Sequence, residues 1–146
     1  MREQKSKRGF TLIELLVVIA IIGLLSTIVM VFYGNARVKA RDARRLSDLK
    51  QMQTALELYY TDEGDYPAGS GVTLGTADYA CLNNTGWHVA GCVDAYIGTV
   101  PTDPKAGAYV YTAASTSYAI DAALEGALSG LSGQIRVSPA GIVNNH

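Results

Sequence analysis

A long apolar segment near the N-terminus constrains this chain more than any other feature of its sequence. Phe10 to Tyr33 is a run of 24 residues rich in Leu, Ile and Val, with Glu14 as its ionisable member. At about 1.5 Å per residue, a helix of this length extends roughly 36 Å, which exceeds the hydrocarbon core of a bilayer at about 30 Å. The sequence therefore predicts a helix that can span a membrane.

The residues that follow the apolar run do not fit an ordinary secretory cleavage site. A removable signal has a shorter apolar stretch and then small residues, whereas residues 33–37 include a tyrosine and an arginine. We therefore expect the apolar helix to stay in the mature protein. Glu14 is costly in lipid unless its carboxylate reaches the headgroups or is paired, so it is either a snorkelling residue or one with a functional partner.

Charge is unevenly distributed, although the formal net charge is only −1. Residues 1–9 carry four basic residues against one acidic residue, and residues 37–50 carry six against two, whereas residues 51–146 carry nine acidic residues against two basic ones. The chain thus has a basic leader, an apolar segment, a basic stem and an acidic head. Because the stem rivals the leader in basic residues, the positive-inside rule alone does not assign the orientation.

Residues 35–63 contain no proline and are predicted to continue the helix. Their apolar residues change face midway, from Ala36, Ala40 and Ala43 to Leu49, Met52, Leu56, Tyr59 and Tyr60 on nearly the opposite side. We expect the second set to pack on the C-terminal part of the chain and the first set to contact other subunits. The whole helix would have roughly 50 residues and a length of about 75–80 Å.

The C-terminal part is predicted to be a small antiparallel sheet that lies on the helix. Gly64 and Pro67 end the helix, and residues 64–107 are predicted to be a loop region. Strands are predicted at 108–112, 117–122, 134–137 and 142–143, with the second hairpin around residues 139–141. The fold class is therefore α+β, with a long N-terminal helix and a β-sheet head at 108–146.

Cys81 and Cys92 lie in the predicted loop region. An even cysteine count beside an export-like N-terminus favours a disulfide, which would add about 2–3 kcal/mol, over two free thiols. Zinc is less favoured because only His88 and His146 are present to complete a set of four ligands.

Residues 7–23, Lys-Arg-Gly-Phe-Thr-Leu-Ile-Glu followed by apolar residues, resemble the class III signal of type IV prepilins and type II secretion pseudopilins. The resemblance rests on a short basic leader that ends at Gly9, an aromatic Phe10 and Glu14 four positions later. It implies that a prepilin peptidase cuts between Gly9 and Phe10 on the cytoplasmic side and N-methylates Phe10. It further implies that the Glu14 carboxylate pairs with the Phe10 amine of a neighbouring subunit during assembly.

The head also resembles this family, especially the major pseudopilin, at residues 64–67, 101–104 and 109–111. The acidic calcium loop of major pseudopilins is reduced here to Asp121 and Glu125, so no calcium and no other cofactor is expected. The resemblance divides the chain into a cleaved leader (1–9), a transmembrane and polymerisation helix (10–34), an amphipathic helix (35–63), the loop region (64–107) and the head (108–146).

The expected function is that of a structural subunit of a type IV pilus, with the major pseudopilin of a type II secretion system as the alternative. The cysteine pair favours the pilus, because a pilin is exposed outside the cell. The implied partners are other copies of the chain, the prepilin peptidase, membrane lipid and an assembly platform in the membrane. The chain would cross the cytoplasmic membrane once with its N-terminus inside and then join an extracellular filament.

Other functional classes have weaker support. Catalysis is not expected, because the sequence has no nucleophile elbow, phosphate loop or two-histidine metal motif. A membrane-anchored DNA receptor is the rival of another class, since four arginines fall on one broad side of the helix, namely Arg37, Arg41, Arg44 and Arg45. The competing interpretation is a solvated or subunit-facing stripe, partly paired by Arg44 with Asp48.

Overall fold

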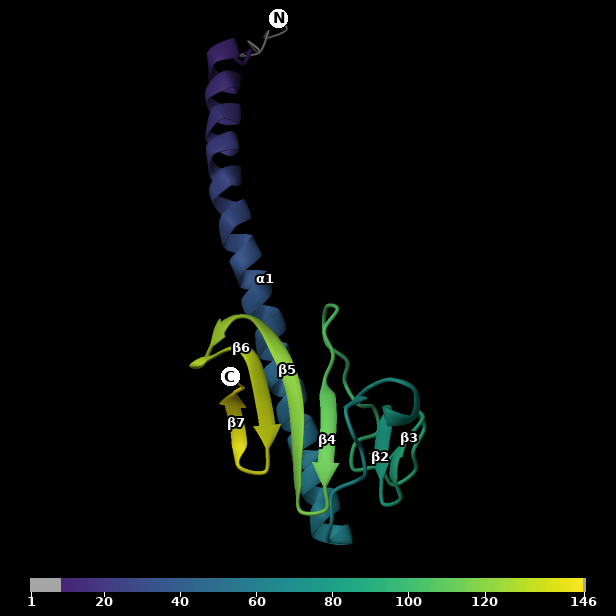
Figure 1. The fold of residues 1–146 in the computed structure, drawn as a ribbon. Helices are drawn as coiled ribbons and strands as arrows, with labels where there is room; N and C mark the ends of the chain where they lie inside the picture. The colour runs from purple at the N-terminus through teal and green to yellow at the C-terminus, as the bar shows by residue number, and fades with distance from the viewer. Residues whose placement is uncertain (1–8, 146) are drawn as a thin grey trace, which may run out of the picture. The chain divides into compact units, whose positions relative to one another are not determined.

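The computed structural model describes residues 9–145, which form one long helix followed by short strands (Figure 1). The helix α1 spans Leu12–Glu63. The elements after it are β1 (Val72–Thr73), the 3₁₀-helix η1 (Ala77–Tyr79), β2 (Cys81–Asn83), β3 (Gly86–His88), β4 (Val110–Ala114), β5 (Ser117–Leu128), β6 (Leu131–Ser138) and β7 (Gly141–Asn144). The expected α+β class is confirmed. The leader lies outside the described residues apart from Gly9.

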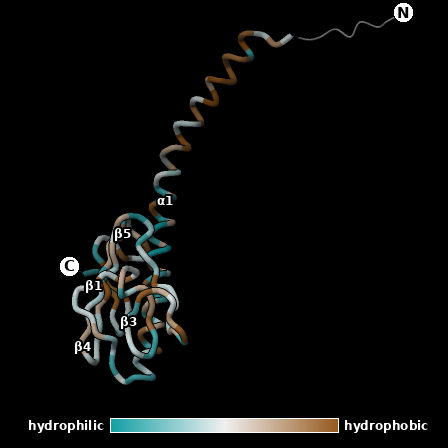
Figure 2. Tube along the Cα trace, turned by 90° about the vertical axis from the view of Figure 1, so that its right-hand side faces the viewer, coloured by the Kyte–Doolittle hydropathy of each residue, from teal (hydrophilic) through white to brown (hydrophobic). Residues whose placement is uncertain are grey.

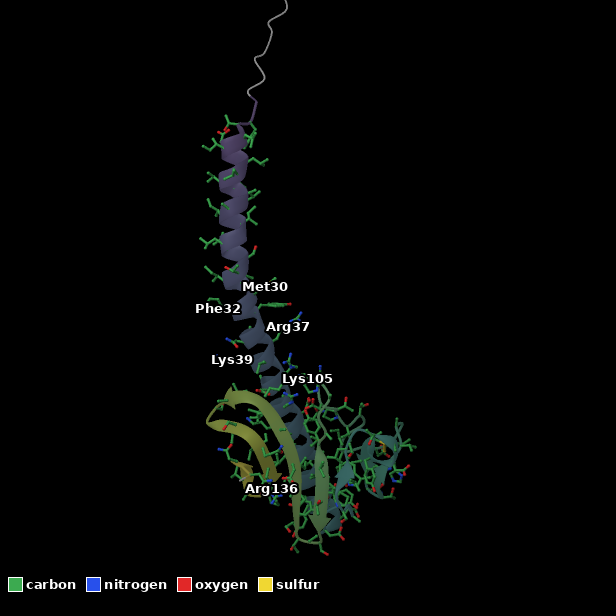
Figure 3. All side chains as sticks on the ribbon, turned by 45° about the horizontal axis from the view of Figure 1, so that its top comes forward. Met30, Phe32, Arg37, Lys39, Lys105 and Arg136 are labelled. Carbon is green, nitrogen blue, oxygen red and sulfur yellow. A yellow bond between two sulfur atoms is a disulfide. The ribbon has the colours of Figure 1, made fainter. Side chains whose placement is uncertain are left out.

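The chain divides into two compact units, the first ending at Arg37 and the second beginning at Val38. In the first unit, every described side chain between Phe10 and Tyr33 is exposed. Figure 2 shows this stretch as the strongly hydrophobic part of the helix, and Figure 3 shows Met30 and Phe32 projecting from it. Among the described residues, α1 is the one helix that is long and apolar enough to cross a membrane, by length and composition.

The second unit contains an antiparallel sheet of five strands in the order β1-β4-β5-β6-β7. Tyr111 on β4 lies opposite Ile120 on β5, and Ile120 lies opposite Val137 on β6. Between β5 and β6 the chain turns at Ser129 and Gly130, both with positive φ (55° and 82°). Two such residues match the right-handed twist of the flanking strands, and glycine adopts this conformation without steric cost.

The core lies between this sheet and the C-terminal part of α1 (Figure 1). Alternate residues of β5 are buried, from Tyr118 through Ile120 and Ala122 to Leu124, as expected for a strand with one covered face. The helix contributes Leu49, Met52, Ala55, Leu56 and Tyr59 to the same cluster, and Tyr60 packs against it. The prediction that the second apolar set packs on the head is therefore confirmed, whereas Ala36, Ala40 and Ala43 are exposed.

Residues 64–107, predicted to be a loop region, contain β1, η1, β2 and β3. The strands β2 and β3 pair with each other, and β1 extends the main sheet by pairing with β4. Leu74, Leu82 and Ile97 from this segment are buried in the core. Strands of two or three residues are too short to show alternation, so the sequence pattern could not reveal them.

The strands of the main sheet also differ in length from the sequence prediction. β5 continues to Leu128 instead of ending at residue 122, and β6 begins at Leu131 instead of residue 134. Three of the six additional β5 residues are alanine or glycine, which have low β-propensity. Their strand conformation depends on pairing with β6 across a register shift between Ala123 and Ala127.

Candidate processing and assembly site

The predicted processing site lies in the short segment before α1. Gly9 and Phe10 are exposed, and 81% of Phe10 is accessible. No described atom lies within 4 Å of the position that a Cβ on Gly9 would occupy. The fold therefore does not require glycine at position 9. If glycine is required there, the requirement would come from an enzyme that binds this segment.

Glu14 forms a capping box with Thr11 at the start of α1. The Glu14 carboxylate accepts hydrogen bonds from the Thr11 backbone N–H at 2.9 Å and from the Thr11 hydroxyl at 2.7 Å. In return, the Glu14 backbone N–H donates to Thr11 Oγ1 at 3.3 Å. This reciprocal pattern satisfies donors at the start of the helix that have no intrahelical acceptor.

The capping box gives Glu14 a structural role at the start of α1. It also adds Thr11 to the residues that contact Glu14. The Thr-x-x-Glu spacing is the sequence signal from which this role of Thr11 could have been predicted. The Glu14 carboxylate lies beside the backbone of Thr11, the residue after Phe10. The Glu14 carboxylate is thus held at the N-terminal end of α1 by two hydrogen bonds from Thr11.

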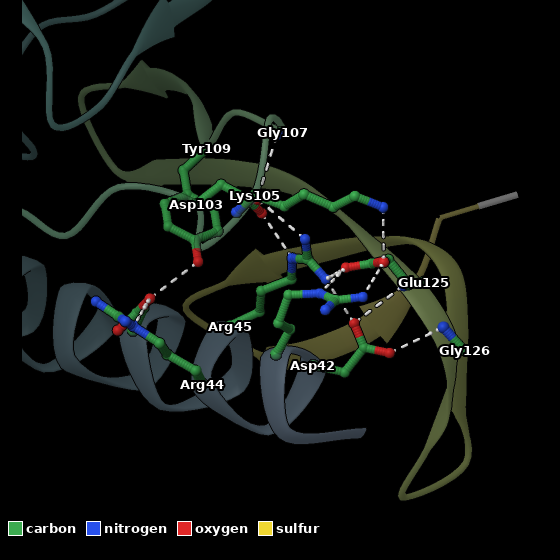
Figure 4. Close-up of polar contacts among 11 residues, drawn as sticks. Asp42, Arg44, Arg45, Asp103, Lys105, Gly107, Tyr109, Glu125 and Gly126 are labelled. Atoms are coloured by element: carbon green, nitrogen blue, oxygen red, sulfur yellow. Dashed lines mark hydrogen bonds and ion pairs between the residues drawn. The ribbon is translucent and has the colours of Figure 1, made fainter. Parts of the chain in front are cut away.

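A second polar site lies within the second unit, which we call the head unit, and is centred on Arg45 of α1 (Figure 4). Only 3% of the Arg45 side chain is exposed. Its guanidinium donates to Asp103 at 2.6 and 3.0 Å, to Asp42 at 2.7 Å and to Glu125 at 2.8 Å. These three carboxylates come from the helix, from the loop before β4 and from β5. The Arg45 cluster, as we call it, therefore joins three segments that are distant in sequence.

The remaining members of the Arg45 cluster balance its charge. Glu125 also binds Arg41 at 2.6 Å and Lys105 at 3.0 Å, which gives three cations and three carboxylates in total. Asp42 accepts the backbone N–H groups of Glu125 and Gly126 at 3.0 and 2.8 Å. Thus a side chain of the helix satisfies backbone donors of β5 where that strand shifts its register.

Hydrogen bonds dominate the electrostatics of the cluster. The Arg45 guanidinium holds the pKa of Asp103 below its usual value, helped by the backbone N–H groups of Lys105 and Gly107. Hydrogen bonds from Arg41 and Arg45 lower the pKa of Glu125. The pKa of Arg45 is raised, chiefly by its bonds to Asp103. Arg45, Asp103 and Glu125 are therefore charged near neutral pH.

The Arg45 cluster corrects the interpretation of the basic stripe. Arg45 is buried and Arg41 is paired with Glu125, so only two of the four arginines are exposed. Arg37 lies 4.3 Å from the centre of the Tyr33 ring and donates to its hydroxyl. Arg44 is 4.0 Å from Asp48, as predicted. Within the second unit, Arg41 and Arg45 thus serve internal ion pairs, and Arg44 remains exposed.

Asp121 and Glu125, the two carboxylates compared above with the acidic loop of major pseudopilins, both form ion pairs. Asp121 pairs with Arg136 at 2.7 Å, and Glu125 belongs to the Arg45 cluster. No group of three His, Cys, Asp or Glu residues in the described part of the chain is arranged to hold a metal ion. Arginine and lysine occupy the positions around these oxygens where a cation would otherwise be bound.

Cys81 and Cys92 form the expected disulfide. Cys81 is fully buried in β2, and Cys92 lies in the segment that follows β3. The bridge ties that segment back to the small two-stranded sheet.

Two family models match the chain. The model described as "Prokaryotic N-terminal methylation motif" matches residues 4–30, and "Type II secretion system (T2SS), protein G" matches residues 33–134. The chain belongs to the type II secretion system protein G family. The first match contains Gly9, Phe10 and Glu14, and the second contains all members of the Arg45 cluster. The expected relationship to pilins and pseudopilins is confirmed.

Curated relatives within and beyond this family include two kinds of protein. The "Type II secretion system core protein G" of Escherichia coli (strain K12) is 31% identical over 110 residues, which cover 75% of this chain and 74% of the relative. The protein of the same name from Klebsiella michiganensis is 33% identical, with coverage of 75% for each chain. "Type IV major fimbrial protein FimA" of Dichelobacter nodosus is 43% identical over 56 residues, 38% of this chain and 36% of the relative. No solved structure shows a significant match.

Proposed function

We propose that this family member is a structural filament subunit of a type II secretion system. The observation that carries the proposal is the extent of the protein G match, which covers residues 33–134 and therefore the stem and most of the head. The similarity to fimbrial FimA is limited to 56 residues. The type IV pilus favoured by the sequence becomes the second candidate, supported by that similarity and by the Cys81–Cys92 disulfide.

The exposed apolar helix explains why such a protein assembles. Residues 10–33 have no core of their own among the described residues, so their apolar surface must be covered by lipid or by other helices. Lipid covers this surface in the membrane-inserted subunit, with the N-terminus inside. Helices of neighbouring subunits cover it in the filament, after an assembly platform in the membrane extracts the subunit.

Processing prepares the N-terminus for this transition. A prepilin peptidase cuts after Gly9 and methylates the Phe10 amine, which removes a leader with four basic residues and leaves one cationic amine. The exposure of Gly9 and Phe10 agrees with access by an enzyme. Since the cut precedes the apolar stretch, the membrane anchor stays with the subunit.

Glu14 supplies the charge that recruits the next subunit. The carboxylate stands at the start of α1, where the Phe10 amine of an adjacent subunit can pair with it when the helices pack. In a water-excluded environment such a pair is much stronger than in bulk water, and an unpaired carboxylate there is costly. Assembly therefore stabilises a charge that the free subunit in the membrane leaves unpaired.

The test compares secretion with surface piliation in the source organism. Deletion of the gene should abolish secretion of folded exoproteins, and the wild-type chain should restore it. A Gly9→Glu variant should fail, and mass spectrometry should find its leader uncut. Intact secretion together with loss of sheared surface filaments would assign the protein to a pilus instead. An uncut, unmethylated wild-type chain in assembled filaments would refute the processing proposal.

A further inference from the structure

A pocket of about 600 Å³ in the head unit is separate from the processing segment and from the Arg45 cluster. It is bounded by the loop after α1, by η1, by β3 and by the turn between β4 and β5. Ligand pockets in proteins usually measure about 300–1,000 Å³, so this one has room for a small ligand or for a side chain of another protein.

Two partly exposed aromatic rings form a corner in its wall. The rings of Tyr79 and Trp87 have centroids 6.3 Å apart and planes inclined by 59°. Trp87 is held by an edge contact with the buried Tyr111, at a centroid distance of 5.3 Å, and by its pairing with Leu82 across β2 and β3. The corner is therefore fixed by the fold before any ligand arrives.

Asp65 and Asp78 also line the pocket, and both are exposed. Neither carboxylate has a hydrogen bond or ion pair within residues 9–145, whereas Asp103, Asp121 and Glu125 are all paired with arginine. No lysine, arginine or histidine is among the described residues that line the pocket. After burial, the Asp65 charge is the main cause that raises the pKa of Tyr59 in the same wall. The pocket is thus anionic.

We propose that this pocket binds an organic cation, an alkylammonium or guanidinium group of the kind that lysine and arginine side chains carry. A cation is attracted by the faces of tyrosine and tryptophan rings and forms charge-assisted hydrogen bonds with carboxylates. Two unpaired carboxylates repel anionic ligands. A neutral ligand would form no ion pair with Asp65 or Asp78.

Trp87 allows a direct test, because it is the only tryptophan in the sequence. The purified full chain in detergent is titrated with the peptide acetyl-Gly-Lys-Gly-amide while tryptophan fluorescence is recorded. The matched probe carries norleucine in place of lysine, and maltotriose tests for a neutral sugar. We expect a saturable change with the lysine peptide and at least tenfold weaker binding of the other two.

Variants of the chain separate the pocket from the general acidity of the head. The double variant Asp65→Asn and Asp78→Asn should weaken binding of the lysine peptide at least tenfold, and Tyr79→Leu should also weaken it. Asp94→Asn removes the same charge from an exposed residue outside the pocket and should leave binding unchanged. Equal binding of the norleucine peptide or maltotriose, no binding of lysine, or full affinity in the double variant would overturn the proposal.

The source of the cation is distinguished by repeating the measurement on assembled protein. The basic stem of another copy offers exposed Lys39, Arg44 and Lys50. If these residues fill the pocket, assembled protein should already show the bound fluorescence, and a triple glutamine variant should lose it. If the cation comes from another molecule, assembled protein should still respond to the peptide. The titration in detergent needs no filament, so its failure is distinct from failure of the proposed function.

Discussion

Arg45 carries a positive charge with only 3% of its side chain exposed, which is uncommon for an arginine. Desolvation of such a charge costs several kcal/mol, and it is tolerated here because Asp42, Asp103 and Glu125 all accept hydrogen bonds from the guanidinium. Removal of the arginine would leave the buried carboxylates of Asp42 and Asp103 without an ion-pair partner. One side chain therefore links the helix, the loop before β4 and β5.

We predict that Arg45→Ala lowers the free energy of unfolding by about 3–5 kcal/mol, the usual cost of breaking a buried ion pair from one side. Urea denaturation of the full chain in detergent, followed by Trp87 fluorescence, measures this change. The control is Arg44→Ala, whose side chain is 67% exposed and should change stability by less than about 1 kcal/mol. Equal effects of the two variants would contradict the role given to Arg45.

Glu14 combines a local structural role with the proposed assembly role, and two substitutions separate them. Glu14→Gln removes the charge but keeps the capping box, since glutamine also serves at this position. Thr11→Ala keeps the charge but removes the cap, at a cost of about 1 kcal/mol in helix stability. The two variants therefore distinguish the effect of the observed hydrogen bonds on assembly from the effect of the proposed charge pairing.

We predict that Glu14→Gln leaves membrane insertion and cleavage intact but strongly reduces filament assembly. Thr11→Ala should assemble better than Glu14→Gln does, because it keeps the charge. Electron microscopy of sheared filaments measures assembly, and mass spectrometry of the mature N-terminus verifies processing. Wild-type numbers of filaments from Glu14→Gln, with normal processing, would make Glu14 a snorkelling residue with a helix cap. In that case the charge-pairing mechanism would be wrong.

At the scale of elements, the segment between α1 and β4 is organised by close backbone packing and not by long strands. Gly75 lies between β1 and η1 with φ of +79°. A Cβ there would lie 2.7 Å from Thr102 Cγ2 and 2.9 Å from the Pro101 carbonyl oxygen. The neighbouring Leu74 is buried in the core. The glycine therefore lets this loop approach residues 101–102 while Leu74 enters the core.

We predict that Gly75→Ala destabilises the head more than Gly71→Ala does. Gly71 also has a positive φ, of +65°, but no atom lies within 4 Å of the position that a Cβ would occupy there, so only the backbone cost of about 1–2 kcal/mol applies. Steric overlap at Gly75 should add about 1–3 kcal/mol. Thermal unfolding by circular dichroism compares the two variants, and similar midpoints would show that the loop relaxes around Gly75.

At the scale of the whole molecule, the basic stem and the acidic head form ion pairs with each other in the Arg45 cluster. Arg41 and Arg45 of the helix pair there with Asp103 and Glu125 of the head at distances of 2.6–2.8 Å. The pKa values of Asp103 and Glu125 are lowered in the folded state, from ordinary values of 3.8 and 4.5. The folded head therefore binds fewer protons than the unfolded chain in mildly acidic solution.

Stability should consequently depend on pH in a defined direction. Because the folded pKa values lie below the unfolded ones, the stabilisation is fully present above the ordinary pKa values and is lost as the pH falls below them. We predict that the urea midpoint of the full chain in detergent is nearly constant from about pH 7 to pH 5 and decreases below about pH 4. The double variant Asp103→Asn and Glu125→Gln should show a smaller acid-induced decrease, and an equal decrease would place its cause elsewhere.

The sequence by itself determined the long helix, the two apolar faces and the relationship to prepilins. These features depend on local patterns: a 24-residue apolar run, a period near 3.6 and the spacing of Gly9, Phe10 and Glu14. Gly64, with φ of +82° directly after α1, likewise follows a local rule for helix ends. The Thr11–Glu14 capping box was also readable from local spacing.

Only the tertiary structure decided which charged and short segments meet. Arg41, Arg44 and Arg45 look alike in the sequence, yet one is buried, one is paired across the fold and one stays exposed, because Asp103 and Glu125 approach from distant segments. The strands β1, β2 and β3 exist through pairing with partners, and the Tyr79–Trp87 pocket exists because η1, β3 and the turn after β4 converge. Such contacts join residues far apart in the chain, so no local periodicity encodes them.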